Sequence, residues 1–188
     1  MRLSQNIWDD KNLIKTLRGG GVVVMPTDTI YGIVGNAQDA STVERVYKTR
    51  KRAPERPCIV LISDINELKK FAVTLSEKQK SAIENFSVPT SFILKCGDEK
   101  LAYLHRGTKT LAFRLPYLPM LQELLLKTGP LIAPSANTEG LPPAKNIPEA
   151  QKYFGNQIDL YIDGGKINNR HSKLVRLNED GSIFVLRN

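Results

Sequence analysis

Residues 19–32 read GGGVVVMPTDTIYG, and this stretch decides the fold. Its four apolar residues, Val22–Met25, are typical of a short buried strand, which Pro26 ends. Before the glycines, Asp10–Leu17 places three apolar residues on one face of an amphipathic helix, and the glycines stop that helix. The sequence therefore predicts a helix that leads into a buried strand.

The same alternation of helices and strands continues along the chain. Further strands are predicted at Cys58–Ile62, Ser91–Leu94, Leu111–Leu115, Leu131–Ala133, Ile158–Ile162 and Ile183–Leu186. Further helices are predicted from a capping box at Ser41–Glu44 to Arg50, after Ser63 or Asp64, from Ser76, and over Met120–Leu126. The segment Leu141–Ala144 is predicted to be a loop that crosses a ligand site or lies passively on the surface. This pattern indicates an α/β fold with a mixed sheet.

Length and composition are those of an ordinary globular protein. Of the 188 residues, 41% are hydrophobic and 24% charged, so we expect a single domain over residues 1–188. No apolar run reaches the roughly 18 residues of a membrane helix, and the start lacks a secretory signal. Cys58 and Cys96 are expected to be buried and reduced, which favours the cytoplasm. With two cysteines and two histidines, no structural zinc site is expected.

The chain is strongly basic. It has 27 Lys and Arg residues against 19 Asp and Glu residues, a formal net charge of +8. Such a charge attracts nucleic acid, a nucleotide or anionic lipid alike, and basic chains without an anionic ligand are also common. The net charge alone therefore does not choose a partner.

A first candidate site follows the strand that ends at Pro26. Three polar residues, Thr27-Asp28-Thr29, come in a row there, and Tyr31 follows. Because open α/β sheets bind ligands at strand ends, hydroxyl groups at this position suit a small polar substrate or a phosphate oxygen. The alternative is an ordinary turn in which Asp28 bonds nearby backbone and Tyr31 packs.

A second candidate is the basic stretch Lys48–Pro57, which holds five cations and one anion. Guanidinium groups bind phosphate oxygens in pairs. The spacing of Arg50 and Arg52 would direct both to one side of an extended segment, where they could reach one polyphosphate. The alternative is a solvated basic loop or a nonspecific contact with phosphodiesters.

Two further strands carry polar groups. Ser135 and Asn137 follow a buried strand at alternate positions, so they can face one anion or one ribose, or simply end the strand in a turn. Arg114 lies on the second face of an apolar strand, where it must meet an anion, form a structural salt bridge or reach solvent. The sequence contains no glycine-rich phosphate loop, dinucleotide fingerprint or metal-ligating histidine pair.

Taken together and in order, four of these pieces resemble the threonylcarbamoyl-AMP synthase family, which is built on the YrdC-like domain. They are Pro26–Gly32, the basic stretch ending in Arg56-Pro57, Phe113–Pro116 and Ala133–Asn137. The resemblance spans about Asn12 to Arg187. It implies a twisted α/β sheet around a basic concave cavity, and a short single-domain form, since longer members carry an extra C-terminal domain.

The resemblance also implies roles for ten residues. The family's Lys-x-Arg pair corresponds to Arg50 and Arg52, which would be catalytic, with Lys48 as an alternative for the lysine position. ATP would be bound by Arg50, Arg52, Thr110, Ser135, Asn137 and Arg187. Threonine would be bound by Thr29, Tyr31, Arg114 and Ser172, with Arg114 on its carboxylate. Lys173 departs from the family pattern, which has threonine at that position.

The implied reaction joins L-threonine, bicarbonate and ATP into threonylcarbamoyl-adenylate and releases pyrophosphate. The product feeds the downstream threonylcarbamoyl-transferase machinery that modifies adenosine 37 of tRNA to N6-threonylcarbamoyladenosine. Mg²⁺ is expected to accompany ATP, with no metal-ligating residues in the chain and no membrane partner. The protein is expected to supply position and positive charge, without an evident general base, because neither His105 nor His171 falls in a motif.

Two rival functions keep the same fold. A module that binds double-stranded RNA or tRNA through its backbone would explain the charge, but it has no need of polar groups at strand ends. A carbamoyl-adenylate activity, like that of the homologous domain in hydrogenase maturation proteins, belongs to much longer chains. The sequence therefore predicts the synthase.

Overall fold

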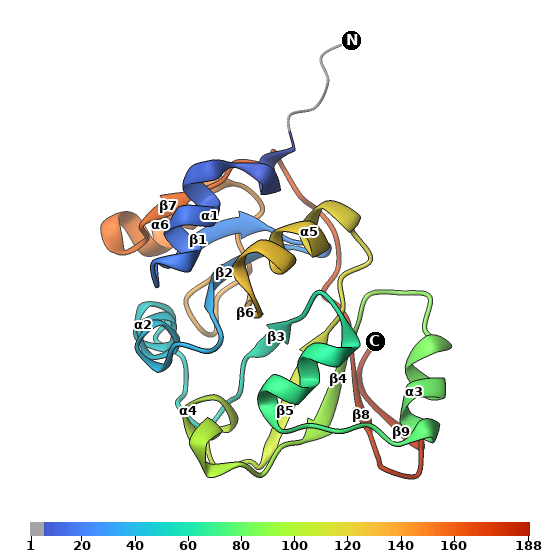
Figure 1. The fold of residues 1–188 in the computed structure, drawn as a ribbon. Coiled ribbons are helices and arrows are strands. Elements are labelled where there is room, and N and C mark those ends of the chain that lie inside the picture. The colour runs from blue at the N-terminus through green and yellow to red at the C-terminus, as the bar shows by residue number, and fades with distance from the viewer. Residues whose placement is uncertain (1–5) are drawn as a thin grey trace.

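The computed structural model describes residues 6–188, which form one nine-stranded sheet with helices packed on it (Figure 1). The strands are β1 (Val23–Pro26), β2 (Tyr31–Asn36), β3 (Ile59–Leu61), β4 (Thr90–Lys95), β5 (Thr110–Arg114), β6 (Leu131–Ile132), β7 (Leu160–Tyr161), β8 (Lys173–Leu177) and β9 (Ile183–Arg187). The α-helices are α1 (Lys11–Arg18), α2 (Ala40–Arg50), α3 (Glu77–Glu84), α4 (Ala102–His105), α5 (Pro119–Thr128) and α6 (Ile147–Phe154). Short 3₁₀ helices are η1 (Ile7–Asp9), η2 (Ile65–Phe71), η3 (Glu99–Leu101) and η4 (Gly155–Gln157).

The strands lie in the order β7-β1-β2-β6-β3-β5-β4-β8-β9. Three neighbouring pairs are parallel, β1–β7, β3–β5 and β4–β8, and the others are antiparallel. This mixed sheet confirms the α/β fold that the alternation of helices and strands predicts. Because β2 pairs with β6, Gly32 forms an isolated bridge with Ser135, which places two of the sequence motifs side by side.

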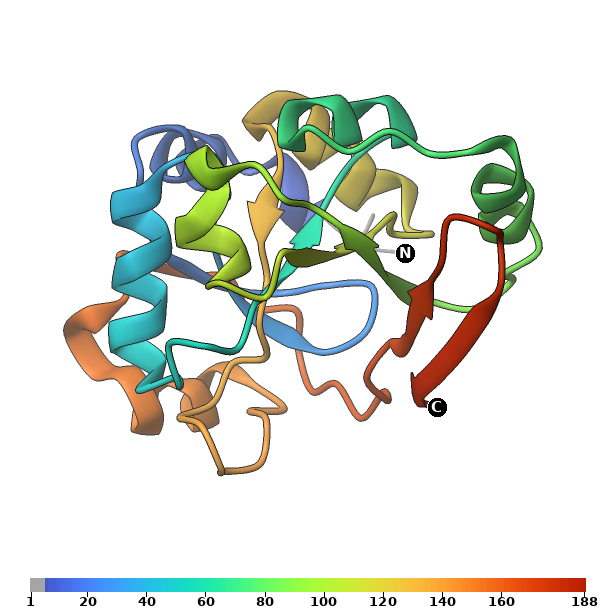
Figure 2. The ribbon, with the colours of Figure 1, turned by 90° about the horizontal axis from the view of Figure 1, so that it is seen from below.

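The strand β1 is buried on both faces, which explains its continuous apolar run. Successive side chains of a strand point to opposite faces. Val23 and Met25 accordingly pack with residues of α1 and α5, whereas Val24 belongs to the larger core on the other side, together with residues of α2. Figure 1 shows α1 and α5 near each other, and α2 and α4 lie side by side in Figures 1 and 2.

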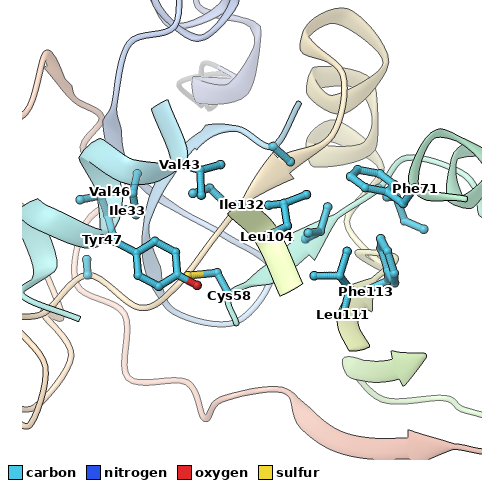
Figure 3. Close-up of a cluster of buried hydrophobic side chains, with 14 of the residues drawn as sticks. Ile33, Val43, Val46, Tyr47, Cys58, Phe71, Leu104, Leu111, Phe113 and Ile132 are labelled. Atoms are coloured by element: carbon cyan, nitrogen blue, oxygen red, sulfur yellow. The ribbon is translucent and has the colours of Figure 1, made fainter. Parts of the chain in front are cut away.

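The part of the larger core that Figure 3 shows extends from α2 to η2 and β5. At one end, Tyr47 of α2 lies next to Cys58, just before β3. At the other, the rings of Phe71 and Phe113 meet edge to face with their centroids 5.2 Å apart. Cys58 and Cys96 are both buried free thiols, as the sequence predicts.

Two helices, α1 and α3, begin where the sequence predicts, and α2 does not. Asp10 caps α1, and Ser76 forms the expected capping box at the start of α3. The capping box predicted at Ser41 is wrong, because Asp39 caps α2 instead and the helix already begins at Ala40. The Asp39 carboxylate accepts the backbone N–H of Ser41 at 2.9 Å and also its hydroxyl group at 2.8 Å, so the Ser41 side chain is already engaged.

Besides short 3₁₀ helices, four elements are absent from the sequence-based prediction: β2, β8, α4 and α6. The strand β2 contains two glycines, which weaken a strand pattern, but Gly35 is required there because a Cβ would lie 2.4 Å from a methyl carbon of Thr42. Cationic residues interrupt the apolar pattern of β8. The helix α6 follows the proline-rich loop directly, starts at the Asn146 cap and carries Pro148 in its first turn.

The hairpin of β8 and β9 forms one edge of the sheet, on the side away from α2 and α4 (Figure 2). The segment after Asp64 is the 3₁₀ helix η2, capped by that residue. None of the helices described in residues 6–188 combines the length and the hydropathy needed to span a bilayer.

Candidate active site

A cavity of about 260 Å³ lies where several strand ends and loops meet. Eight of the ten residues singled out from the sequence line it: Thr29, Tyr31, Arg52, Thr110, Arg114, Ser135, Ser172 and Arg187. The other two, Arg50 and Asn137, are buried and hydrogen-bonded to Ser135. The fold thus brings together motifs that are spread over nearly the whole chain.

The cavity is positively charged. Three arginines line it, Arg52, Arg114 and Arg187, and no Asp or Glu side chain of residues 6–188 does. Threonine and serine hydroxyl groups supply neutral donors and acceptors between them. Guanidinium groups bind phosphate and carboxylate oxygens through pairs of hydrogen bonds. The lining therefore fits an anionic ligand.

The turn after β1 contributes hydroxyl groups. The Oγ1 atoms of Thr27 and Thr29 lie 3.1 Å apart, and both residues line the cavity. Tyr31 is fully buried, and its hydroxyl group donates to the carbonyl oxygen of Gly165 at 2.8 Å and accepts the N–H of Gly164 at 2.9 Å. Burial raises the pKa of Tyr31. Tyr31 therefore anchors the segment at Gly164, and the neighbouring threonines face the cavity.

Arg114 forms a buried ion pair with Asp28. Its Nη2 atom lies 2.8 Å from Oδ1 of Asp28, and the two side chains are 4% and 3% exposed. Within residues 6–188, Arg114 Nε has no hydrogen-bond partner, and neither has Asp28 Oδ2. Burial lowers the pKa of Arg114, and the adjacent Asp28 opposes that shift. Arg114 therefore forms a structural salt bridge, and the same residue lines the cavity.

Arg50 is placed differently from the expectation. It is the last residue of α2, and Lys51 caps the helix with a φ of 51°, so Arg50 and Arg52 do not share one side of an extended segment. The predicted geometry is wrong because the helix continues through Arg50. Its Nε donates to the carbonyl oxygen of Asn137 at 3.0 Å, and its Nη2 donates to the Asn137 side-chain oxygen at 3.0 Å. Burial, with Arg52 nearby, lowers the pKa of Arg50 to about 10.

Asn137 directs its side chain into the protein. Its amide group donates to the carbonyl oxygens of Thr138 and Leu141, and its side-chain oxygen accepts the hydroxyl group of Ser135 at 2.6 Å. Ser135 and Asn137 are expected from the sequence to face one ligand together; instead their side chains bond each other, and only Ser135 lines the cavity. Arg50 and Asn137 do not line the cavity. They hydrogen-bond to Ser135 and hold the loop that places it there.

The basic loop after α2 is tied to the same segment by Glu139. Its carboxylate accepts the N–H of Ala53 and forms an ion pair with Arg56 at 3.0 Å, while its own N–H donates to the carbonyl oxygen of Arg50 at 2.9 Å. Arg52 closes that loop by donating from Nε and Nη2 to two carbonyl oxygens within it, each at 2.9 Å. The sequence analysis does not identify Glu139, because its partners lie more than eighty residues away.

Replacing Glu139 with glutamine is expected to lower the free energy of unfolding by about 1 kcal/mol at pH 7, since its ion pair with Arg56 is partly exposed. The Ala53 N–H bond holds the pKa of Glu139 below its ordinary value of 4.5. Its contribution is therefore complete above that value and is lost as the pH falls through the lower pKa of the folded state. Urea unfolding at pH 7 and pH 3 measures this. A difference that does not shrink as the pH is lowered from 7 to 3, or an equal one for the exposed Glu84→Gln control, contradicts the prediction.

Ser172 and Arg187 close the opposite wall. The buried Ser172 hydroxyl lies 2.9 Å from that of Ser91, and Arg187 donates from Nη2 to the Ser172 carbonyl oxygen at 2.9 Å. Thr110 lines the cavity from the start of β5. Lys173 does not line this cavity. It lines a second, adjoining cavity of about 620 Å³. Thr29 and His171 line both cavities.

His171 is a titratable residue that lines the cavity and lies outside the sequence motifs. Its position directly before Ser172 is the one sequence signal that points to it. Burial lowers the pKa of His171, and the positive charges of Arg187 and Arg114 lower it further. In the part of the chain that the structure describes, no cluster of three or more His, Cys, Asp or Glu side chains is placed to hold a metal ion.

The chain resembles known proteins over most of its length. The Sua5/YciO/YrdC family model, described as telomere recombination, matches residues 15–188. A threonylcarbamoyl-AMP synthase of Bacillus subtilis (strain 168) is 32% identical over 152 residues, which are 79% of this chain and 44% of that protein. A putative threonylcarbamoyl-AMP synthase of Methanocaldococcus jannaschii is 30% identical over 176 residues, 92% of this chain and 82% of that protein.

A solved structure has the same fold. Sua5 of Pyrococcus abyssi, crystallised with L-threonine, matches 96% of this chain with a TM-score of 0.85 and 27% identity, and this chain covers 54% of it. The chain thus spans about half the length of some of its relatives. The matched family model and the shared fold both extend over most of residues 6–188, and the protein belongs to the Sua5/YciO/YrdC family.

Proposed function

We propose that this protein is a threonylcarbamoyl-AMP synthase, an enzyme that transfers the adenylyl group of ATP. The observation that carries the proposal is the convergence of eight residues singled out from the sequence on one cavity with three arginines and no carboxylate from residues 6–188. Two further observations support it. Relatives carry this name, and a Sua5 relative with the same fold was crystallised with L-threonine.

The proposed reaction has two bond-forming steps. The neutral amine of threonine attacks the carbon of bicarbonate and yields a carbamate and water. A carbamate oxygen then attacks the α-phosphorus of ATP, and the bond to the β-phosphate oxygen breaks, so that pyrophosphate leaves. Negative charge gathers around the phosphates, and catalysis consists largely of positioning and electrostatic stabilisation.

The arrangement of the cavity supports a division of roles. Arg114 would hold the threonine carboxylate through its guanidinium group while Asp28 fixes its other side, and Thr29 and Ser172 would complete that end. Arg52 would stabilise the charge on the phosphates. Thr110, Ser135 and Arg187 would bind the nucleotide. Arg50 and Asn137 would act through Ser135, and Tyr31 through the segment at Gly164.

The remaining partners belong to the same proposal. Mg²⁺ would enter as the complex with ATP, as part of the substrate. The adenylate would pass to a downstream threonylcarbamoyl-transferase and from there to tRNA. The buried free thiols are consistent with a cytoplasmic enzyme.

An omission experiment tests the proposed function. Pyrophosphate release is measured with L-threonine, bicarbonate, Mg²⁺ and ATP together, and then with each of threonine, bicarbonate and ATP left out. We expect release with the complete mixture, loss of release in every omission, and an adenylate with the mass of threonylcarbamoyl-AMP. Release that continues without threonine overturns the proposal. So does the absence of release from a protein that binds double-stranded RNA with a steep salt dependence, which would favour the RNA-binding alternative.

A further inference from the structure

The proposed reaction needs a proton acceptor. An amino acid carries its amine as ammonium near neutral pH, and ammonium has no lone pair with which to attack bicarbonate. A proton must therefore leave the nitrogen before the first bond forms. A positioned side chain with a pKa near or below the working pH accelerates such a transfer.

Among the ionisable side chains of residues 6–188 that line the cavity, one can accept a proton at neutral pH. Arginine side chains stay protonated, so three of the candidates are excluded. Burial raises the pKa of the Cys58 thiol and of the Tyr31 hydroxyl, so neither is an available base. The remaining group is the imidazole of His171.

His171 lies at the end of the cavity that is assigned to threonine. It directly precedes Ser172, and with Thr29 it lines both the main cavity and the adjoining one. Both of these neighbours belong to the end assigned above to threonine. His171 is an exposed residue that lines the adjoining, larger cavity, so a proton that it accepts has a path to solvent.

We propose that His171 is the general base that deprotonates the threonine ammonium, an inference that rests on the proposed function. The imidazole nitrogen takes one proton from the ammonium and becomes imidazolium. The freed amine attacks bicarbonate, the new C–N bond forms, and one water leaves as the carbamate is produced. The imidazolium then releases its proton to water through the adjoining cavity, which restores the neutral base.

The charges around His171 keep it neutral between turnovers. Arg114 from β5 and Arg187 from β9 lower its pKa, in addition to the effect of burial. Arg170 and Lys173 flank it in the chain and line the adjoining cavity. Asp28 also lines that cavity, but its charge is paired with Arg114. At pH 7 the base form therefore predominates.

The test compares the pH dependence of His171→Ala and His171→Gln with that of the wild type, in the pyrophosphate assay. Without the base, the reaction depends on threonine that is already deprotonated in solution. We expect the variants to lose about 100-fold in kcat/KM for threonine at pH 7. The loss should shrink about tenfold per pH unit up to the pKa of the amine, and added imidazole should restore part of the rate to the alanine variant. Lys166→Ala, an exposed change in the same loop, should behave as wild type.

The outcomes separate this inference from the proposed function. If the wild type shows no threonine-dependent release, both fail together. If the wild type is active and the variants keep its rate, His171 is not the base. A loss that is the same at every pH and is not relieved by imidazole also overturns the proposal, because a structural role alone produces that result. Thermal unfolding of His171→Gln shows whether the variant is folded.

Discussion

Replacing Arg52 with alanine is expected to reduce threonine-dependent pyrophosphate release by roughly 10²- to 10³-fold while the protein stays folded. Arg52 lines the cavity, where no Asp or Glu of residues 6–188 neutralises its charge, and its hydrogen bonds go to backbone oxygens of its own loop. Loss of this cation removes stabilisation of the charge that develops as pyrophosphate leaves. Initial rates at saturating ATP and threonine, together with circular dichroism, measure the effect.

The matched control is Arg176→Ala. This arginine lies on β8, is exposed and does not line the cavity, so its removal changes the net charge equally. We expect the control to retain the wild-type rate. Near-normal turnover in the Arg52 variant, or an equal loss in both variants, means that the cavity does not use Arg52 in the proposed way.

Replacing Asp28 with alanine is expected to lower the free energy of unfolding by about 3–5 kcal/mol. The reason is that Asp28 is the carboxylate that Arg114 contacts, and its removal leaves a guanidinium charge buried without compensation. For a chain of this size, such a loss lowers the melting temperature by roughly 6–20 °C. Urea unfolding followed by circular dichroism measures the free energy directly.

An exposed ion pair provides the control for that experiment. Asp9 pairs with Lys127 at 2.6 Å, and the two side chains are 57% and 42% exposed. The same change, Asp9→Ala, should cost less than about 1 kcal/mol. Equal losses of unfolding free energy for Asp28→Ala and Asp9→Ala would show that burial does not make the Asp28–Arg114 pair more important than an exposed one. The double variant Asp28→Ala with Arg114→Met should recover part of the loss, because it removes the uncompensated charge as well.

The fold and much of the site follow from local patterns. Apolar runs such as Val22–Met25 have the length of a strand and can be recognised in the sequence. The sheet brings together the polar residues that follow these runs. The alternation around Arg114 correctly puts it on a buried face of β5 where it must meet an anion, and Asp28 supplies one. Residues whose chemistry follows from their own strand were therefore the easiest to predict.

Other features depend on contacts between distant segments, which no local pattern encodes. Arg50 resembles Arg52 in the sequence, but the helix continues through it and turns it toward Asn137, whereas Arg52 lies beyond the helix end. His171 reaches the cavity because the adjacent strand β8 pairs with β4, with Lys173 opposite Thr90. The sequence could not show this pairing, because the charged residues of β8 hide its strand pattern.

The proposed cavity can be observed with its substrates in place. Crystals of the protein grown with L-threonine and a non-hydrolysable ATP analogue should show both ligands in the cavity of about 260 Å³ and its adjoining space. We expect the threonine carboxylate within hydrogen-bond distance of Arg114 and the phosphates within reach of Arg52. A cavity that stays empty at saturating ligand, or a nucleotide bound elsewhere on the surface, would contradict the proposed function.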